Sequence, residues 1–430
     1  MNSSDEAKLQ AKAVDAIRKK LIGKKLDYKE VYAIMDEIVN ERLGDVLTTY
    51  FAASGYSNGF SNQELYFLTK AMVETGEKLE FKGIVADKHS IGGVAGTRTT
   101  LIVVPIIAAA GFKIPKSSSR AITTPTGTAD DMEILAPIEL TKEKIYEVVE
   151  KTNGCLVWGG KFNLAPADDI LINIEKPLLF ESYDKVLVSI MAKKIAFGSN
   201  HVVIDVPYGR MVKVHTIKDA KVLKRKFEYL AKRFRIKIRV LIHRTDEPAG
   251  RGVGPILETR EALRVLQQKE NRPLDLEVRS INLASNLLEI CLADSPQKLQ
   301  NEIAKKYGNC FGWATQILKD GTAFRKFEEI IKAQGGKDEM DSEDLKPGEF
   351  SFEVKAEKNG TVKKIDGKNL TILAKLLGAP TEKGSGIYLN KKIGEKFEKG
   401  ETVYTLFSQT VYNLDETKKS LDHFKIMTIV

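Results

Sequence analysis

Apolar residues recur at helical spacing between residues 5 and 76 of the chain. Four segments carry the pattern, namely KAVDAIRKKL, YKEVYAIMDEIV, LGDVLTTYFAASG and NQELYFLTKAMVET. The stretch 54–59 is expected to interrupt this series in its middle, because it combines glycines with serines. Amphipathic helices bury their apolar faces against one another, so the pattern predicts a small all-α bundle.

Strand-like and helix-like segments then alternate. Strands are predicted in FKGIVADKHS and at 171–174, 202–206 and 236–242. TRTTLIVVPIIAAAGF is typical of an apolar helix that Pro105 kinks or interrupts. A basic helix at 218–235 has an apolar stripe expected to pack in the core, formed by Val222, Leu223, Phe227, Leu230 and Phe234. The alternation predicts a large α/β domain with a mostly parallel central sheet.

A polar, acidic segment rich in turn formers, 334–350, is typical of a linker. After it, FEVKAEKNGTVKKIDG and GIYLNKKIGEKFEKGETVYTLFS alternate apolar and polar residues around glycine-centred turns. We therefore expect a C-terminal β-rich (α+β) subdomain at 346–430. The other two expected domains are an α-helical one, 1–76 with about 165–197, and an α/β phosphate-binding one, 78–164 with 198–335.

Composition narrows the class of protein. The formal net charge of +9 is modest for 430 residues and suits a protein that handles phosphate-bearing small molecules without requiring nucleic acid. The three cysteines are far apart and form no CxxC pair, so neither a metal site nor a disulfide framework is expected. The first residues lack a signal peptide's apolar stretch, and no apolar run is long enough to span a bilayer. These absences favour a cytoplasmic protein that does not bind membranes.

The first candidate site is the run Lys88-His89-Ser90-Ile91-Gly92-Gly93-Val94-Ala95-Gly96-Thr97. It follows a predicted strand and precedes a predicted helix. Glycines let backbone N–H groups approach an anion, and Lys88 adds charge. The spacing is not that of a Walker P-loop. A tight turn with an exposed lysine is the alternative interpretation.

The second candidate site is SSSRAITTPTGTAD, residues 117–130, in which hydroxyl side chains surround Arg120 before a predicted helix. Thr128 and Asp131 have the spacing of a capping box. Hydroxyl residues in a turn are often only local turn formers. Two anion-friendly turns within forty residues are harder to explain in that way, so we expect a phosphate site.

KHSIGGVAG followed by SSRAITTPTGTADDME resembles the thymidine and pyrimidine-nucleoside phosphorylase family, with most similarity to its archaeal-type AMP phosphorylase branch. The likeness continues through LVWGGKFNLAPADDILI, SIMAKKIAFGSNHVVIDVPYGRMVKV and TDEPAGRGVGPILETREAL. It implies a glycosyltransferase of nucleotide metabolism and a homodimer. Inorganic phosphate would be its co-substrate, and no other cofactor is implied.

The resemblance also implies roles for individual residues. Those that match phosphate-holding positions of thymidine phosphorylases are Lys88, Ser90, Ser118 and Thr128. Those that match nucleotide-contacting positions of the AMP phosphorylase branch are Gly93, Ser119, Arg120, Ala121, Ile122, Thr123, Thr124, Thr128, Ser189 and Lys213. His89 and Lys193 match substrate-contacting positions of thymidine phosphorylases. A satisfied structural histidine is the alternative for His89.

The chain departs from the family pattern in three ways. Glu181 stands where the AMP phosphorylase branch has its aspartate proton donor. The stretch 164–169, LAPADD, lacks the arginine with which thymidine phosphorylases read the base, and this favours the nucleotide-cleaving branch. The similarity begins after the branch's additional N-terminal domain, so large assemblies are not expected.

Phosphorolysis of an N-glycosidic bond needs a held phosphate and an acid that protonates the departing base. Glu181 is the acid that the resemblance implies. Asp168 and Asp169 are rivals, because paired carboxyls can raise one pKa, although capping or pairing with lysines would also explain them.

The leading hypothesis is phosphorolysis of an AMP-like nucleoside 5′-monophosphate to ribose 1,5-bisphosphate and free base. Phosphorolysis of thymidine or another pyrimidine nucleoside is the alternative. A phosphoribosyltransferase and a non-enzymatic nucleotide- or RNA-binding module are more distant ones.

Overall fold

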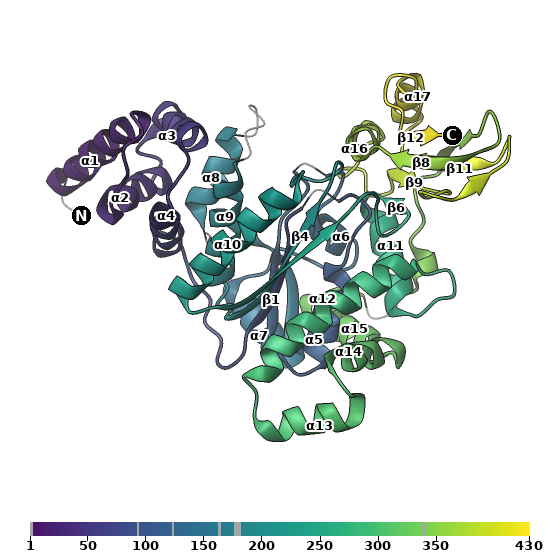
Figure 1. Ribbon diagram of the computed structural model, residues 1–430, viewed down its shortest axis with the longest axis horizontal. Coiled ribbons are helices and arrows are strands. Elements are labelled where there is room, and N and C mark those ends of the chain that lie inside the picture. Colours follow the sequence, from purple (N-terminus) through teal and green to yellow (C-terminus); the bar gives the residue numbers. More distant parts are fainter. Residues whose placement is uncertain (1–2, 93, 123, 162–164, 176–181, 338–339) are drawn as a thin grey trace. The chain divides into compact units, whose positions relative to one another are not determined.

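The computed structural model describes residues 3–92, 94–122, 124–161, 165–175, 182–337 and 340–430 (Figure 1). These residues form two compact units. Unit 1 consists of Met1–Val85, Gly159–Asn200 and Lys221–Ile238. Unit 2 consists of Ala86–Trp158, His201–Ala220 and Arg239–Val430.

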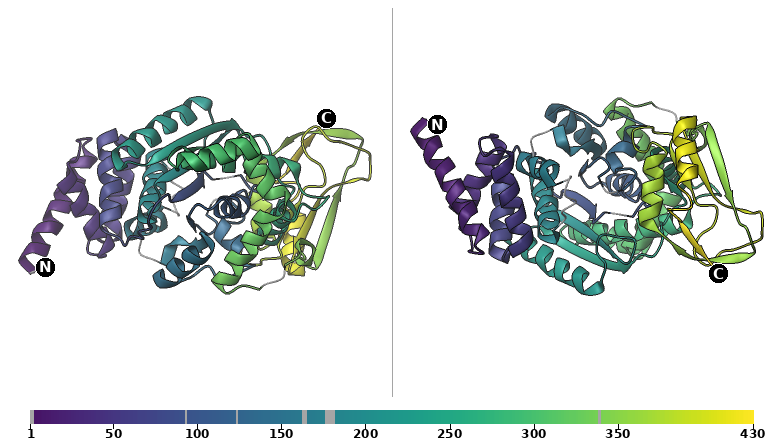
Figure 2. Two further views of the ribbon diagram at one scale, coloured as in Figure 1. Left: turned by 90° about the horizontal axis from the view of Figure 1, so that it is seen from below. Right: turned by 90° about the horizontal axis from the view of Figure 1, so that it is seen from above.

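Unit 1 is helical. Its elements are α1 (Ser3–Leu21), α2 (Tyr28–Val39), α3 (Gly44–Asn58), α4 (Asn62–Glu74), α8 (Pro166–Glu175), α9 (Tyr183–Ala196) and most of α10 (Ile217–Phe234). The first four lie next to one another in every view (Figures 1 and 2). A capping box begins α4, where Ser61 and Glu64 satisfy each other's backbone N–H groups. Glu64 also accepts a buried hydrogen bond of 2.9 Å from Lys20 Nζ, which joins α1 to α4.

Two local predictions in unit 1 are wrong. The stretch 54–59 does not interrupt the bundle, because α3 continues to Asn58 and ends at Gly59. A Cβ at Gly55 would lie 2.5 Å from the Phe60 ring, so the glycine allows this ring to lie against the helix. Residues 171–174 are part of α8 rather than a strand. Their alternation suggested a strand, but Pro166 at the first position and two aspartates in the first turn begin a helix.

Unit 2 contains the parallel sheet that the alternating pattern predicted. Its strands form two hydrogen-bonded groups. One has the order β1-β4-β5, with β1 (Ala86–Ser90), β4 (His201–Tyr208) and β5 (Lys237–Arg244), whose first two residues belong to unit 1; the other pairs β2 (Ile114–Ser118) with β3 (Gly154–Trp158). β1 pairs in parallel with β4, and β2 in parallel with β3. A hydrogen bond of 2.7 Å from Ala86 N to Lys113 O joins the beginnings of β1 and β2. Four strands therefore end at one edge.

Helices surround this sheet (Figure 1). They are α5 (Thr100–Ala109), α6 (Thr128–Met132), α7 (Lys142–Thr152), α11 (Pro255–Leu266), α12 (Leu274–Ala293), α13 (Gln297–Tyr307), α14 (Cys310–Lys319) and α15 (Thr322–Gln334). α5 is buried almost all round, and it runs through Pro105 as one helix. In α10, Leu223, Phe227 and Leu230 of the predicted stripe are core, while Val222 and Phe234 are only partly buried.

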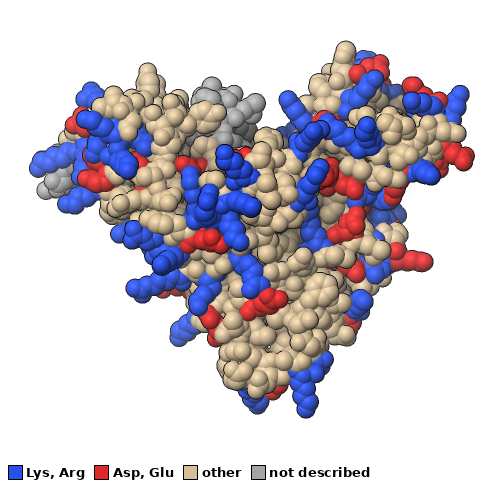
Figure 3. All heavy atoms as spheres, viewed as in Figure 1, with Lys and Arg blue, Asp and Glu red and all other residues tan. Residues whose placement is uncertain are grey.

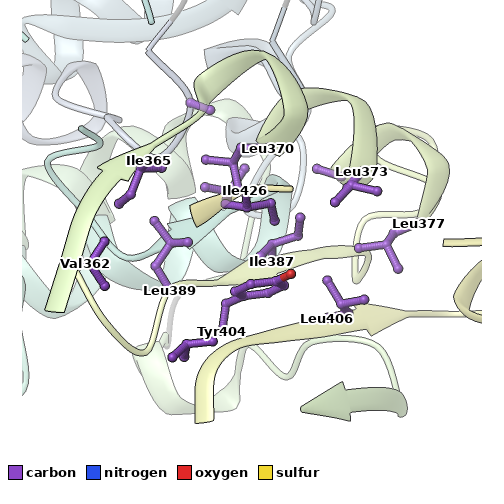
Figure 4. Close-up of a cluster of buried hydrophobic side chains, with 14 of the residues drawn as sticks. Val362, Ile365, Leu370, Leu373, Leu377, Ile387, Leu389, Tyr404, Leu406 and Ile426 are labelled. Atoms are coloured by element: carbon purple, nitrogen blue, oxygen red, sulfur yellow. The ribbon is translucent and has the colours of Figure 1, made fainter. Parts of the chain in front are cut away.

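The C-terminal part of unit 2 is β-rich. Its elements are β7 (Phe350–Lys355), β8 (Gly360–Ile365), α16 (Gly367–Leu376), β9 (Gly386–Tyr388), β10 (Lys396–Phe397), β11 (Thr402–Ser408), α17 (Val411–Lys419) and β12 (Met427–Ile429). Buried side chains from its strands and from α16 form one core (Figure 4). β9 also pairs with the short strand β6 (Gly252–Val253), which precedes α11. The C-terminal part is therefore continuous with the rest of unit 2.

Surface charge and hydropathy add two observations. Figure 3 shows lysine and arginine side chains over the visible face with acidic side chains among them, which is typical of a solvated surface. No helix in the described ranges has the length and apolar character needed to cross a bilayer.

Candidate active site

The carboxyl edge of the parallel sheet gathers the predicted phosphate residues of unit 2. Ser90 ends β1, Ser118 ends β2, and Tyr208 ends β4 just before the turn that carries Lys213. In open α/β sheets, ligands bind at this edge of the strands. The topology thus brings together segments that lie far apart in the sequence.

Lys88 is buried, and its Nζ donates hydrogen bonds to Thr99 Oγ1 at 2.6 Å and Thr100 Oγ1 at 3.3 Å. Burial lowers the pKa of Lys88 to about 8, although the carboxylate of Asp205 opposes the shift. A buried ammonium held by neutral hydroxyls has charge left for an anionic ligand. The alternative of an exposed lysine in a tight turn is wrong.

Two hydroxyl groups extend this site. The hydroxyl of Ser118 is buried and has no hydrogen-bond partner within the described residues. Buried hydroxyls are normally satisfied, so an unpaired one at a strand end suits a polar ligand. Thr128 begins α6, and its Oγ1 lies 3.4 Å from Nη1 of Arg98, one residue before Thr99. The segment around Arg98 and Thr99 therefore lies between Lys88 and Thr128.

Asp130 organises the segment 119–127, whose residue 123 lies outside the described residues. Its Oδ2 accepts hydrogen bonds from Ala121 N at 2.7 Å and Gly127 N at 2.8 Å. Gly127 precedes α6 and lies so close to the backbone of Ser119 that a Cβ would be 2.4 Å from its carbonyl oxygen. The predicted capping pair of Thr128 with Asp131 is wrong, because the N-cap residue is Gly127 and its N–H is accepted by Asp130, the third residue of α6.

Arg120 is already bound to carboxylates. Its guanidinium donates two hydrogen bonds to Glu133, at 2.8 and 2.7 Å, and lies 3.3 Å from Asp130. These hydrogen bonds from Arg120 lower the pKa of Glu133 to about 2, with a further contribution from Lys383. The ring of Trp158 lies below the guanidinium. In this structure Arg120 orders the segment, and its carboxylate partners compete with any ligand.

A buried network below Thr128 joins α6 to α11. Arg98 pairs with Asp131, and its Nη2 lies 2.8 Å from Glu258. Burial raises the pKa of both carboxyls, and Arg98 offsets part of that effect. Thr126 donates a hydrogen bond of 2.6 Å to Asp131. This network fixes the turn from which Thr128 projects.

A second polar network lies where β1 and β4 end. Asp205 of β4 is buried and accepts a hydrogen bond of 2.8 Å from Ser90 Oγ. Its other oxygen lies 3.1 Å from Nδ1 of His243, and Arg279 bonds to His243 and lies 3.8 Å from Asp205. Burial alone would raise the pKa of Asp205, but His243 and Arg279 hold it below its usual value. Asp205 therefore fixes the Ser90 hydroxyl.

The turn that carries Lys213 follows β4. Gly209 N donates a hydrogen bond of 2.9 Å to Val214 O and closes the turn. Gly209 has φ of 149°, and a Cβ there would lie 2.4 Å from the carbonyl oxygen of Thr245, the residue after β5. The close approach requires glycine, and it places Lys213 at the carboxyl edge of the sheet.

Unit 1 holds a separate cluster on α8 and α9. Oδ2 of Asp168 accepts a hydrogen bond of 2.6 Å from Ser189 and lies 2.9 Å from Lys193 Nζ. Lys193 also bonds to Asp169 at 3.3 Å. Burial raises the pKa of Asp169, Asp168 adds to the effect, and Lys193 opposes it. The structure thus brings Ser189 and Lys193 together with both rival acids.

Several predicted site residues lie outside the described residues, namely Gly93, Thr123 and Glu181. His89 lies in β1 beside Lys88 and is partly exposed. No group of three or more His, Cys, Asp or Glu side chains in the described ranges is arranged to hold a metal ion.

No sequence pattern indicated four residues that support the site, namely Arg98, Asp205, His243 and Arg279, and Asp130 was part of the second candidate site without its supporting role. One signal was available, because Asp205 is the single acid in the apolar run HVVIDV. Such a residue in a buried strand needs a polar partner. The partners, His243 and Arg279, come from distant segments and had no local signal.

Models of known domains match most of the chain. The a/b domain of a glycosyl transferase family matches residues 82–307, and the helical bundle domain of the same family matches residues 14–76. The first match alone covers more than half of the chain. This chain belongs to that glycosyl transferase family. A pyrimidine nucleoside phosphorylase C-terminal domain matches residues 361–425.

Individual relatives agree with the glycosyl transferase family. AMP phosphorylase of Thermofilum pendens is 41% identical over 99% of this chain and 81% of its own length. AMP phosphorylase of Methanocaldococcus jannaschii is 43% identical over 95% of this chain and 79% of its own. A protein of Legionella pneumophila, provisionally named thymidine phosphorylase, is 42% identical over 92% of this chain and 73% of its own.

The fold is also known from a solved structure. Anthranilate phosphoribosyltransferase from Thermus thermophilus superimposes with a TM-score of 0.59 at 17% identity, over 74% of this chain and 99% of that one. The predicted family and fold class are confirmed. As a member of this glycosyl transferase family the protein is an enzyme, a phosphorylase-type pentosyltransferase of nucleotide metabolism.

Proposed function

We propose that the protein cleaves the N-glycosidic bond of an AMP-like nucleoside 5′-monophosphate with inorganic phosphate, giving ribose 1,5-bisphosphate and the free base. The proposal rests on two observations, the buried ammonium of Lys88 in β1 and the unpaired buried hydroxyl of Ser118 at the end of β2. The names of the two relatives that are 41% and 43% identical support the choice of substrate.

In this proposal Lys88, Ser90, Ser118 and Thr128 hold the phosphate that attacks the anomeric carbon. The reacting sugar gains positive charge as the bond to the base breaks, so a fixed anion next to it lowers the barrier. Positioning supplies much of the effect, because the phosphate is held for attack at the anomeric carbon. The networks around Asp205 and Arg98 keep two of these hydroxyls in place.

The departing base needs a proton. We propose Glu181 as its donor on the basis of the family resemblance, with Asp169 as the rival. Asp169 has a raised pKa, which a general acid needs near neutral pH. Asp168 is the weaker rival, because both Ser189 and Lys193 already bind it. The rate should fall at high pH as the general acid loses its proton. Of Glu181→Gln and Asp169→Asn, measured at several pH values, the variant that no longer shows this fall identifies the acid.

The first test is phosphate dependence. Base release from AMP should require added phosphate and should be supported by arsenate, and it is measured by chromatography of the free base. Equal release in phosphate-free buffer would mean hydrolysis and would contradict the proposal.

The second test concerns the 5′-phosphate, for which we propose Lys213 as a ligand. A charge-assisted contact contributes roughly 1.5–3 kcal/mol, so Lys213→Ala should lower kcat/KM for the monophosphate about ten- to a hundredfold. The matching nucleoside should be affected little. Equal losses on both substrates would contradict this role.

Phosphorolysis of thymidine or another pyrimidine nucleoside is the second candidate. It is favoured by the relatives provisionally named thymidine phosphorylase, which are 41–42% identical. The stretch 164–169 has no arginine to read a pyrimidine base, and this argues for the first candidate. A wild-type enzyme that preferred thymidine to every monophosphate would reverse the order.

A further inference from the structure

The C-terminal part of unit 2 contacts each of the ligand-binding segments proposed for that unit. Ala95, in the glycine-rich turn after β1, is buried in the same apolar core as Leu370 and Leu373 of α16. The core of the C-terminal part is therefore built partly on the turn that follows Lys88. Burial of this kind fixes the turn, because well-packed cores tolerate little displacement.

α16 contacts a second segment through Lys375. Nζ of Lys375 donates a hydrogen bond of 3.0 Å to the carbonyl oxygen of Ile122, in the middle of the segment 119–124. Lys383, after the same helix, lies 2.8 Å from Glu133 and 3.8 Å from Asp130. Those two carboxylates bind Arg120, and Asp130 also binds Ala121 N. Two lysines of the C-terminal part thus support this segment.

The first residue of α16 contacts the third segment. A Cβ at Gly367 would lie 2.8 Å from Cβ and Cε of Met211, and 3.3 Å from its carbonyl oxygen. Met211 stands two residues before Lys213 in the turn after β4. The absence of a side chain at Gly367 allows this turn to approach the helix.

We propose that α16 is a positioning element for nucleotide binding, with Lys375 and Gly367 as positioning residues that act through Ile122 and Met211. The identity of the ligand rests on the proposed function. The geometry itself does not, because the helix contacts both segments whatever substrate they bind. Loss of the contact with Ile122 or with Met211 should therefore raise KM for the nucleotide, while the rate of the bond-breaking step stays the same.

The experiment compares Lys375→Met, Lys375→Arg and Gly367→Ala with wild type. Lys419→Met is the matched control, because Lys419 is an exposed lysine of α17 that pairs with Glu416 one turn earlier on the same helix. Alanine is favoured in helices, so Gly367→Ala should keep α16 folded while it displaces Met211. Steady-state kinetics with AMP and phosphate are measured together with hydrogen–deuterium exchange of peptides covering 119–127 and 208–214.

Lys375→Met should raise KM for AMP about fivefold, the effect of one solvent-exposed hydrogen bond, with kcat within twofold of wild type. Hydrogen–deuterium exchange in 119–127 should rise. In Lys375→Arg, both KM for AMP and this exchange should be close to the wild-type values. Gly367→Ala should raise KM for AMP and exchange in 208–214. Lys419→Met should change neither quantity.

Unchanged exchange in both segments would overturn the proposal. So would faster exchange with KM for AMP unaltered, or faster exchange throughout β7 to β12 that Lys375→Arg does not restore. If wild type released no base from any monophosphate, the proposed function would fail, yet the exchange data would still decide whether α16 orders the two segments.

Discussion

The titration of Lys88 gives a quantitative test of the phosphate site. Burial lowers its pKa to about 8, so the ammonium that we propose as a phosphate ligand loses its proton just above neutral pH. With that value about nine tenths of Lys88 is charged at pH 7 and about one tenth at pH 9. If only the charged form binds phosphate, kcat/KM for phosphate should fall about tenfold between these pH values.

The assay measures initial rates of base release at subsaturating phosphate from pH 6.5 to 9.5. Lys88→Arg is the matched variant, because arginine keeps its charge throughout this range. Its ratio to wild type removes the titration of phosphate itself, since both enzymes are measured in the same solutions. The 5′-phosphate of AMP does not interfere, because its second pKa is about 6.

Calorimetry provides an independent measurement if Lys88→Arg binds phosphate poorly. Wild type should take up a proton when it binds phosphate at pH 9, seen as a dependence of the binding enthalpy on the buffer. A flat kcat/KM profile from pH 7 to 9.5, with no proton uptake and with unchanged circular dichroism, would refute the reasoning.

Two further predictions concern stability. Lys20→Met should cost about 3–5 kcal/mol in urea unfolding, because it leaves the buried carboxylate of Glu64 without its cation. Burial raises the pKa of Glu64, but hydrogen bonds from Lys20, Ser61 and Leu26 together lower it by more than burial raises it, so the net pKa is below 4.5. The wild-type contribution should therefore be present above about pH 4.5 and be lost as the pH falls through the folded-state value. Asp168→Asn should cost about 1–3 kcal/mol by urea unfolding, less than for a fully buried pair because Lys193 is a quarter exposed; no change would contradict the pairing of Asp168 with Lys193.

Local sequence patterns were sufficient to predict most helices and strands and the fold class. Helical spacing found the four N-terminal helices, and the stripe of α10 was recognised as core because its period matches one helix face. The order of strands and helices predicted the parallel sheet. The two turns with hydroxyl and lysine side chains were found from their local composition.

Predictions from local patterns failed where a short run fits both the helix and the strand period, or where contacts with other residues determine the conformation. Residues 171–174 alternate like a strand, yet the first-turn signals before them begin a helix. The glycine at 55 looked like a break, although it lies inside α3 with the Phe60 ring against it. In both cases residues outside the short stretch determined its local structure.

How the predicted site residues are held depends on tertiary contacts. Arg120 was expected to face a ligand, and it is bound by Glu133 and Asp130. Asp205 receives its partners from β1, β5 and α12, and α16 reaches the backbone at Ile122 from more than 250 positions away. Periodicity reports which face of an element is buried, but the partner of a buried charge is set by the packing of distant segments, which a single sequence does not encode in its local pattern.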